Sequence, residues 1–218
     1  ASATLNISSA LNTNQWHHVA MTYEDDSDDE ISLYVDGKFV GASTDGSGAP
    51  ASTDTANLLI GGTTTANFDG GIDDFRVYQY ARSADEIRAD YNAGLSAKFG
   101  VSPADWVTKD LVGYWPFESG SGTTTIDATN QGNDGFLFNM DANTDWVASK
   151  PGLGSALDFD GTNDYVDVLA FDPHTYNDFT IMAWYKSTDS SVSDDGYIFN
   201  HGDGTDNITF GSTDDASQ

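Results

Sequence analysis

The sequence contains no cysteine, and no apolar run in it approaches the roughly 18 residues that a membrane-spanning helix needs. Disulfides, thiolate metal sites and cysteine nucleophiles are therefore excluded. Basic residues are scarce as well, since 8 Lys and Arg stand against 35 Asp and Glu, a formal net charge of −27. Because binding to phosphate groups needs clustered Lys and Arg, we expect no nucleic-acid partner and no membrane insertion.

Glutamate is also rare, so the acidic residues are almost all aspartate, which is typical of turns and loops rather than of helix surfaces. The chain has 12 Phe, 10 Tyr and 5 Trp, enough aromatic area for a packed core. Its 218 residues suffice for one large β domain or two small ones. Dense aspartate also suits calcium binding, or a salt-rich solvent that screens self-repulsion.

Alternation of apolar and polar residues with a period of two dominates the sequence. Residues 18–23 and 31–35 alternate in this way, and Asp36-Gly37 separates the second run from residues 38–40, which predicts a β-hairpin. Further strands are expected at residues 58–62, 72–78, 111–117, 156–159, 165–168, 179–185, 197–200 and 207–210. Many short strands between Gly- and Asp-rich turns predict a sandwich.

Two short helical segments interrupt the strands. Residues 83–86 form a capping box, Ile87 and Tyr91 lie on one helix face, and Gly94 is expected to end the helix. Residues 102–105 open a shorter turn with proline at the first helical position. Residues 95–109 are therefore interpreted as a connector between two parts.

Several motifs together resemble the laminin-G-like, concanavalin A-like lectin/glucanase jelly roll. The motifs of the first part resemble the second half of such a domain, and those of the last part resemble its first half. The motifs are WHHVA at 16–20, LYVDG at 33–37, IGG at 60–62, FDGGIDDFRVY at 68–78, LVGYWPF at 111–117, Asp127 with NDG at 133–135, LDFDGTNDYV at 157–166 and FTIMAW at 179–184.

The resemblance implies an all-β jelly-roll sandwich, with one or two short helices in the connector, whose halves occur in permuted order. Residues 1–94 correspond to the C-terminal half, 95–109 to the connector and 110–218 to the N-terminal half. Neither half can stand alone, because each exposes open strand edges and an uncovered apolar face.

Three arrangements satisfy this requirement. The halves can pair within one chain, exchange between neighbouring chains into a head-to-tail filament, or belong to one repeat of a tandem array. We expect completion by neighbouring copies, either by exchange or within a tandem array.

Calcium is the cofactor that the resemblance implies, held where the loops of the first half meet the final strand. Calcium takes six to eight oxygen ligands from Asp, Asn, carbonyls and water. Asp73 is the best single candidate. By analogy the other candidates are Asp127, Asn133, Asp160, Asn163 and Asp164. The alternative is that these residues simply form turns.

Other polar motifs carry weaker predictions. The acidic run at residues 24–30 has Glu30 where a calcium-binding EF-hand loop needs glycine, so it is interpreted as a solvated turn. His17 and His18 are adjacent on a strand and face opposite sides, so they cannot chelate one metal together. No Glu-x-Asp-x-Glu strand and no Gly-x-Ser-x-Gly motif occurs, so we expect no enzyme activity.

Carbohydrate binding remains open. Trp146 and Trp106 lie outside the clearest strand patterns and are the candidates for stacking on sugar rings, with core packing as the alternative. Asn6 and Asn207 begin glycosylation motifs. The leading hypothesis is an extracellular or cell-surface structural and adhesive module, completed by other copies of itself. The alternative is a calcium-dependent glycan-binding module in the form of a circularly permuted monomer.

Overall fold

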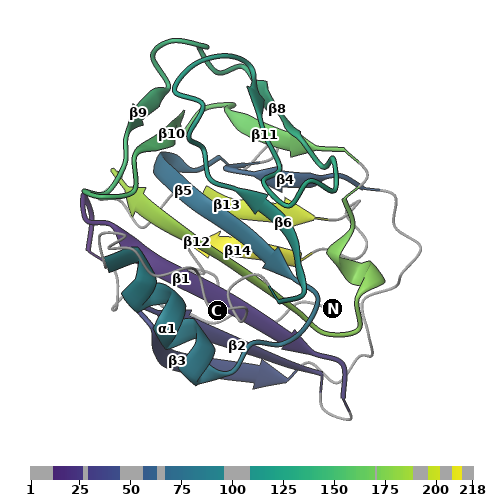
Figure 1. The fold of residues 1–218 in the computed structure, drawn as a ribbon. Coiled ribbons are helices and arrows are strands. Elements are labelled where there is room, and N and C mark those ends of the chain that lie inside the picture. Colours follow the sequence, from purple (N-terminus) through teal and green to yellow (C-terminus); the bar gives the residue numbers. More distant parts are fainter. Residues whose placement is uncertain are drawn as a thin grey trace, which may run out of the picture.

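The computed structural model describes residues 12–26, 29–44, 56–62, 67–95, 109–169, 171–188, 196–201 and 208–212. These residues fold into two antiparallel sheets that pack face to face, with helix α1 (Ala84–Leu95) across the outer face of the larger sheet (Figure 1). The sandwich of two antiparallel sheets confirms the all-β fold class predicted from the sequence; α1 lies just before the connector in which short helices were predicted.

The larger sheet, sheet A, has the strand order β3-β2-β1-β12-β5-β10-β9, and β6 pairs with β5 beside this path. Every pairing in it is antiparallel. Its strands are β1 (His17–Glu24), β2 (Glu30–Val35), β3 (Lys38–Thr44), β5 (Asp69–Tyr78), β6 (Leu111–Trp115), β9 (Trp146–Ala148), β10 (Ser155–Asp160) and β12 (Phe179–Ser187).

The smaller sheet, sheet B, has the order β14-β13-β4-β11-β8-β7 and is also antiparallel throughout. Its strands are β4 (Leu58–Ile60), β7 (Thr124–Thr125), β8 (Gly135–Phe138), β11 (Tyr165–Val168), β13 (Gly196–His201) and β14 (Ile208–Ser212). A short 3-10 helix, η2 (Pro173–Thr175), precedes β12.

Both sheets combine strands from the two predicted halves. In sheet A, β12 of the second half lies between β1 and β5 of the first half; in sheet B, β4 of the first half lies between β13 and β11. β1 and β12 pair within one chain, from His17 opposite Tyr185 to Tyr23 opposite Phe179. The halves therefore complete each other in this structure. Exchange of halves between neighbouring chains would need the same contacts across two chains, and it remains a prediction.

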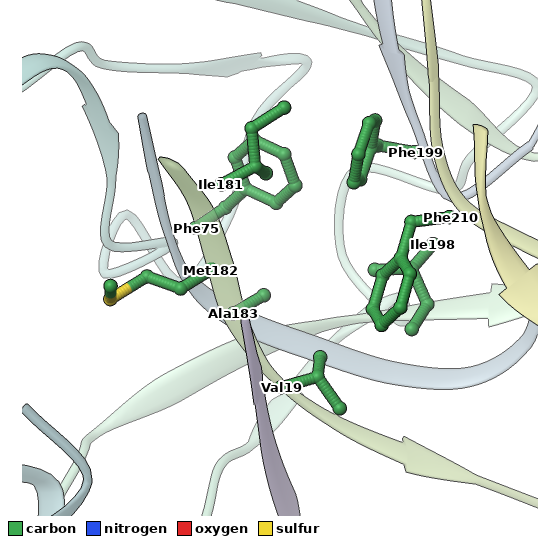
Figure 2. Close-up of a pocket in the computed structure, with 8 residues that line it drawn as sticks. All are labelled: Val19, Phe75, Ile181, Met182, Ala183, Ile198, Phe199 and Phe210. Atoms are coloured by element: carbon green, nitrogen blue, oxygen red, sulfur yellow. The ribbon is translucent and has the colours of Figure 1, made fainter. Parts of the chain in front are cut away.

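The core lies between the sheets and follows from the period-two pattern. Inward-facing residues such as Val19, Ile72 and Phe159 on sheet A meet Ile60 and Val166 on sheet B, and all are at most 1% exposed. Figure 2 shows a residual space in this core, between β12 and the β13–β14 hairpin, lined by Val19, Phe75, Ile181, Met182, Ala183, Ile198, Phe199 and Phe210. The space is too small for a water molecule, so it is a packing defect and not a ligand pocket.

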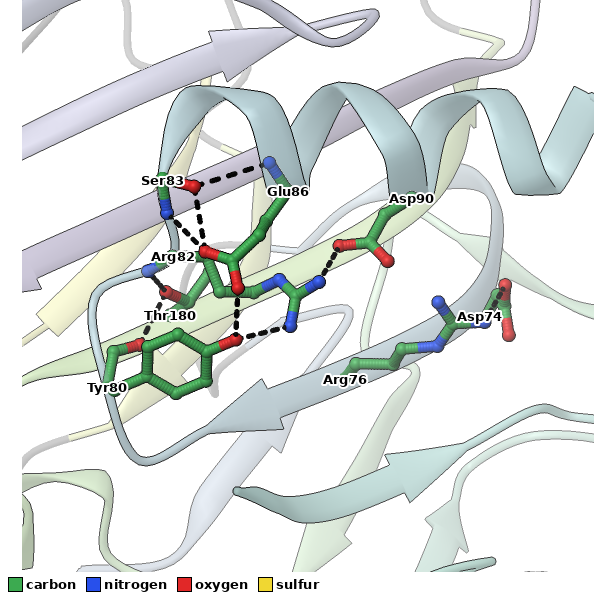
Figure 3. Close-up of polar contacts among 8 residues, drawn as sticks. All are labelled: Asp74, Arg76, Tyr80, Arg82, Ser83, Glu86, Asp90 and Thr180. Carbon is green, nitrogen blue, oxygen red and sulfur yellow. Dashed lines mark hydrogen bonds and ion pairs between the residues drawn. The ribbon is translucent and has the colours of Figure 1, made fainter. Parts of the chain in front are cut away.

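Helix α1 begins as its sequence predicts. The Ser83 amide donates to the Glu86 carboxylate (2.9 Å) and the Glu86 amide donates to Ser83 Oγ (3.4 Å), which is the reciprocal capping box. The fully buried ion pair between Arg82 and Asp90 (2.8 Å) fastens the helix, and the Arg82 guanidinium also donates to Tyr80 Oη (Figure 3). Ile87, fully buried, packs with Ala20, Tyr34, Tyr78 and Met182 of sheet A.

Most predicted strands are confirmed, and so is the hairpin. Asp36 and Gly37 both have positive φ (50° and 71°), which is the type I′ geometry that the Asp-Gly pair favours. The helix ends at Leu95, one residue beyond Gly94. The short strands β7, β8 and β9 were not predicted, and the turn at residues 102–105 lies outside the described part of the chain. Within that part, no helix is both long and apolar enough to cross a bilayer.

Candidate functional site

The outer face of sheet B carries a row of exposed apolar side chains. On β8, Gly135 and Leu137 turn toward the core while Phe136 and Phe138 point outward, and each outward ring is 42% exposed. Ile126 (56% exposed) and Leu169 (53% exposed) continue the outward alternation just past β7 and β11. Isolated exposed apolar residues are ordinary, but a contiguous group on one sheet face marks a contact surface.

The strand register places a carboxylate within this aromatic surface. Phe138 lies opposite Tyr165 on β11, and their rings are stacked with centroids 5.0 Å apart and an interplanar angle of 4°. Phe136 lies opposite Asp167, which in turn lies opposite Leu59 on β4. We call Phe136, Phe138, Tyr165, Asp167 and Leu59 the sheet-B face. Such a surface can stack against a flat apolar ring face and hydrogen-bond to its edge.

Asp167 is held in a partly dehydrated setting. Burial raises the pKa of its carboxyl group, while a hydrogen bond from the Asn57 side chain lowers that pKa. Its Oδ1 atom is buried and has no hydrogen-bond partner among the described residues. This acceptor can therefore accept a hydrogen bond from a ligand donor, provided the surrounding side chains shift to admit it.

The calcium candidate Asp73 lies on the outer face of sheet A, opposite Trp184 on β12. It is 1% exposed; Ser149 Oγ donates to its Oδ2 at 2.5 Å, and its Oδ1 has no partner among the described residues. The pKa of Asp73 is raised to about 8, with burial as the largest cause; the Ser149 hydrogen bond lowers this pKa, and the negative charges of Asp74 and Glu118 raise it. A buried carboxylate with an unsatisfied oxygen beside other acids is an environment that a cation would stabilise.

Glu118 is the residue beside Asp73 that was not predicted from the sequence. Its carboxylate accepts from the Ser155 amide (3.2 Å) and lies where a side chain at Gly154 would collide with it. Asp73 comes from the first part of the chain, whereas Glu118, Ser149 and Ser155 come from the last. The sequence did contain a signal for Glu118. Glutamate is scarce in this chain, and Glu118 stands in a turn, where the other acidic residues are mostly aspartate.

Asp127 and Asn133 lie in contact, but hydrogen-bond donors of the protein already occupy the Asp127 carboxylate. Asp127 is 2% exposed and accepts hydrogen bonds from the Tyr114 and Thr129 amides, the Thr129 hydroxyl and both nitrogens of Asn133. The backbone carbonyl of Asn133 also accepts a hydrogen bond from Trp115 Nε1 (2.8 Å). These contacts organise the segment between β6 and β8, which is the turn-forming alternative considered for these residues.

Asp160, Asn163 and Asp164 share the turn between β10 and β11. Asp160 Oδ1 accepts from the amides of Thr162 and Asn163, and Asp164 Oδ2 accepts from the Asp160 amide (3.1 Å). The pKa of Asp164 is raised to about 6, with burial as the largest cause and the negative charges of the neighbouring acids as further causes. The six calcium candidates thus fall into three separate neighbourhoods. Across the described ranges, no three His, Asp or Glu side chains form a group that could hold a metal ion.

The predicted stacking role of Trp146 is corrected by its position. Trp146 is 8% exposed within the main core, and its Nε1 donates to the Gly122 carbonyl (3.0 Å), so its ring offers no face to a ligand. Its β-strand, only three residues long, gave no alternation to reveal the inward direction. Trp106, Asn6 and Asn207 lie outside the described residues.

The histidines and the acidic turn are accounted for locally. His17 and His18 are both buried; His17 Nδ1 lies 2.9 Å from Asp36 Oδ2, and His18 packs on Trp184. Burial lowers the pKa of His18 to about 3, with the Arg76 charge as the next cause. In the acidic turn Tyr23 Oη donates to Asp29 (3.2 Å), while residues 27 and 28 lie outside the described residues.

Comparison with known proteins supports the family resemblance over part of the chain. The family model of the concanavalin A-like lectin/glucanases superfamily, of the laminin-G type, matches residues 1–88. No curated protein and no solved structure matches the chain. The permuted order of the halves remains a prediction. The match over residues 1–88 and the two-sheet antiparallel sandwich together confirm the predicted resemblance to the laminin-G-like, concanavalin A-like jelly roll.

Proposed function

We propose that this protein is an extracellular or cell-surface adhesive module that binds glycans through the sheet-B face. The observation that carries the proposal is the pair of exposed rings, Phe136 and Phe138, beside the Asp167 carboxylate. Sugars present an apolar C–H face and a polar hydroxyl edge, and this surface offers a counterpart to each. The similarity to a superfamily named for its lectins and glucanases supports the same assignment.

A glycan array with the wild-type protein, followed by titration of the best ligand, tests the proposal. Phe136→Ala and Phe138→Ala should each weaken binding about tenfold, the order of one or two lost aromatic contacts. Phe39→Ala is the matched control, because Phe39 is also an exposed phenylalanine (56%) but lies on β3 of sheet A. Absence of any glycan ligand, or equal losses in all three variants, would contradict the proposal.

We further propose that Asp73, with Glu118 and the Ser149 hydroxyl, contributes to a structural calcium site. The support is the buried, unpartnered Asp73 Oδ1 and the closeness of the Glu118 charge. An ion bound only by the folded state stabilises that state by mass action. Chelation should therefore lower the melting temperature, and Asp73→Ala should remove this sensitivity while Asp85→Asn on α1 retains it. A melt that excess chelator leaves unchanged would exclude a structural ion.

A second candidate function is that of a fibre or tandem-repeat subunit completed by neighbouring copies. It rests on the interleaving of strands from the two halves in both sheets, because each half alone would leave open strand edges. An exchanged pair would have to form between chains the β1–β12 pairing that this structure forms within one chain. An exchanged interface would contain the domain core and would resist dilution. The mass in solution across a wide concentration range tests this. A monomeric mass throughout would exclude exchange and leave a module whose halves pair within one chain.

A further inference from the structure

The Lys and Arg residues are distributed very unevenly over the sandwich. Of the 8 Lys and Arg, all but Lys98 lie in the described part of the chain. Every one of these belongs to, or packs against, sheet A or its helix. Lys38 is on β3, Arg76 on β5 and Lys186 on β12; Arg82 pairs with Asp90 and Arg88 with Asp85 of α1; Lys109 lies over Tyr80, and Lys150 over Trp184 of β12.

Among the described residues, the sheet-B face therefore has no Lys or Arg that could pair with a negatively charged ligand. Its one charged group is Asp167, between Phe136 and Leu59 in the strand register. The protein as a whole has a formal charge of −27, so its long-range field repels anions and attracts cations. Ring faces act in the same direction, because the negative face of an aromatic ring attracts an ammonium group.

We propose, resting on the glycan-binding function above, that the sheet-B face selects glycans that carry free amino groups, of the glucosamine class. The Asp167 carboxylate pairs with the sugar ammonium, and Phe136 stacks on the sugar ring beside it. Sulfated and uronate-containing glycans are rejected, since they would bring negative charge to an acidic surface. A second copy of this chain is disfavoured as the occupant for the same reason, because it carries the same net charge.

The experiment compares three oligosaccharides of equal length at physiological salt. The probes are a β-1,4-linked glucosamine hexamer, its fully N-acetylated counterpart and a sulfated glucosamine hexamer, each titrated calorimetrically. We expect the free-amine hexamer to bind about tenfold more tightly than the acetylated one, and the sulfated one not to bind. Asp167→Asn should weaken binding of the free-amine hexamer about fivefold, the upper range for a surface ion pair, and leave the acetylated hexamer unaffected.

Asp85→Asn supplies the matched control, because it makes the same change in net charge on an exposed side chain of α1. If it weakens binding as much as Asp167→Asn does, the attraction is global and the proposal is overturned. Equal affinity for the free-amine and acetylated hexamers, lost in Phe136→Ala, would overturn the amine preference but retain the glycan-binding function. Binding of no hexamer would overturn the amine preference, and the glycan array then decides the broader function. A change of mass in Phe136→Ala would reassign the face to contacts between copies.

Discussion

The outer faces of the two sheets are built by the same alternation of residues, but their aromatic side chains are buried on sheet A and exposed on sheet B. On sheet A, Trp184 is 2% exposed because Tyr91 of α1 stacks on it and Lys150 lies 3.5 Å above its ring. On sheet B, Phe136 and Phe138 are 42% exposed. The difference shows that an outward aromatic residue becomes core or surface according to what the rest of the chain lays over it.

The two faces also differ in how they handle charge. Sheet A carries ion pairs on its outer side: Arg82 and Asp90 are paired with wholly buried side chains, and Arg76 of β5 pairs with Asp74 at 2.7 Å (Figure 3). The sheet-B face leaves Asp167 without an opposite charge among the described residues. The first face is therefore interpreted as structural and the second as available for a ligand.

The largest effect should come from breaking the buried ion pair of sheet A. Asp90→Ala removes the carboxylate that pairs with the buried Arg82 guanidinium, and we expect it to cost about 3–5 kcal/mol in the free energy of unfolding. Asp85→Ala removes an exposed partner of Arg88 on the same helix and should cost less than about 0.5 kcal/mol. Denaturant unfolding of both variants measures the difference. Equal losses would show that α1 is not fastened through Arg82.

The next effect concerns pH and the buried acids of sheet A. Asp73 has its pKa raised to about 8, so in the folded state it holds a proton that the unfolded chain releases near pH 4. The folded state thus binds more protons across this window, and stability must fall as pH rises through it. His18, whose pKa is lowered to about 3, acts in the opposite direction below about pH 6.5.

The effect of Asp73 is therefore separated from that of His18 between about pH 6.5 and 8.5, measured in the presence of chelator. Thermal melts of the wild type should move to lower temperature across it, whereas Asp73→Asn, which cannot ionise, should give a flatter profile. Asp85→Asn should keep the wild-type slope. A slope that survives in Asp73→Asn would assign the titration to another group.

Salt should have a smaller, general effect that both faces share. With a net charge of −27, self-repulsion destabilises the compact state in dilute buffer. At about 1 M monovalent salt the Debye length is roughly 3 Å, so stability should rise. Melts in sodium chloride check this, and a flat series would show that the acidic groups are balanced locally.

The smallest effect should be on the stability of the sheet-B face itself. Phe136→Ala removes an exposed ring and should change the free energy of unfolding by less than about 0.5 kcal/mol. Phe75→Ala, which removes a fully buried ring, should cost about 3–5 kcal/mol. Chemical denaturation of the two variants distinguishes a ring that contributes to core packing from a ring that is free to contact a ligand. A large loss in Phe136→Ala would mean that the face is packed against other parts of the chain.

Local patterns in the sequence determined much of the architecture. Alternation specified β1, β2, β5 and β12, Asp36-Gly37 specified the hairpin turn, and the Ser83 capping box specified the start of α1. Each of these signals depends on residues within a few positions of one another, where turn geometry and hydrogen bonding act directly. The overall sandwich followed from them and from the family resemblance.

The candidate sites were decided by tertiary structure. Phe136 and Phe138 lie in a four-residue strand whose continuous apolar run does not reveal which side faces water, and the burial of Trp146 depends on packing from elsewhere in the chain. Asp73 was predictable as an acidic residue on a strand, but its neighbour Glu118 lies in the other half of the sequence. Sequence alone determined most of the strands and the acidity; only long-range packing decided which aromatic rings are exposed and which acids meet.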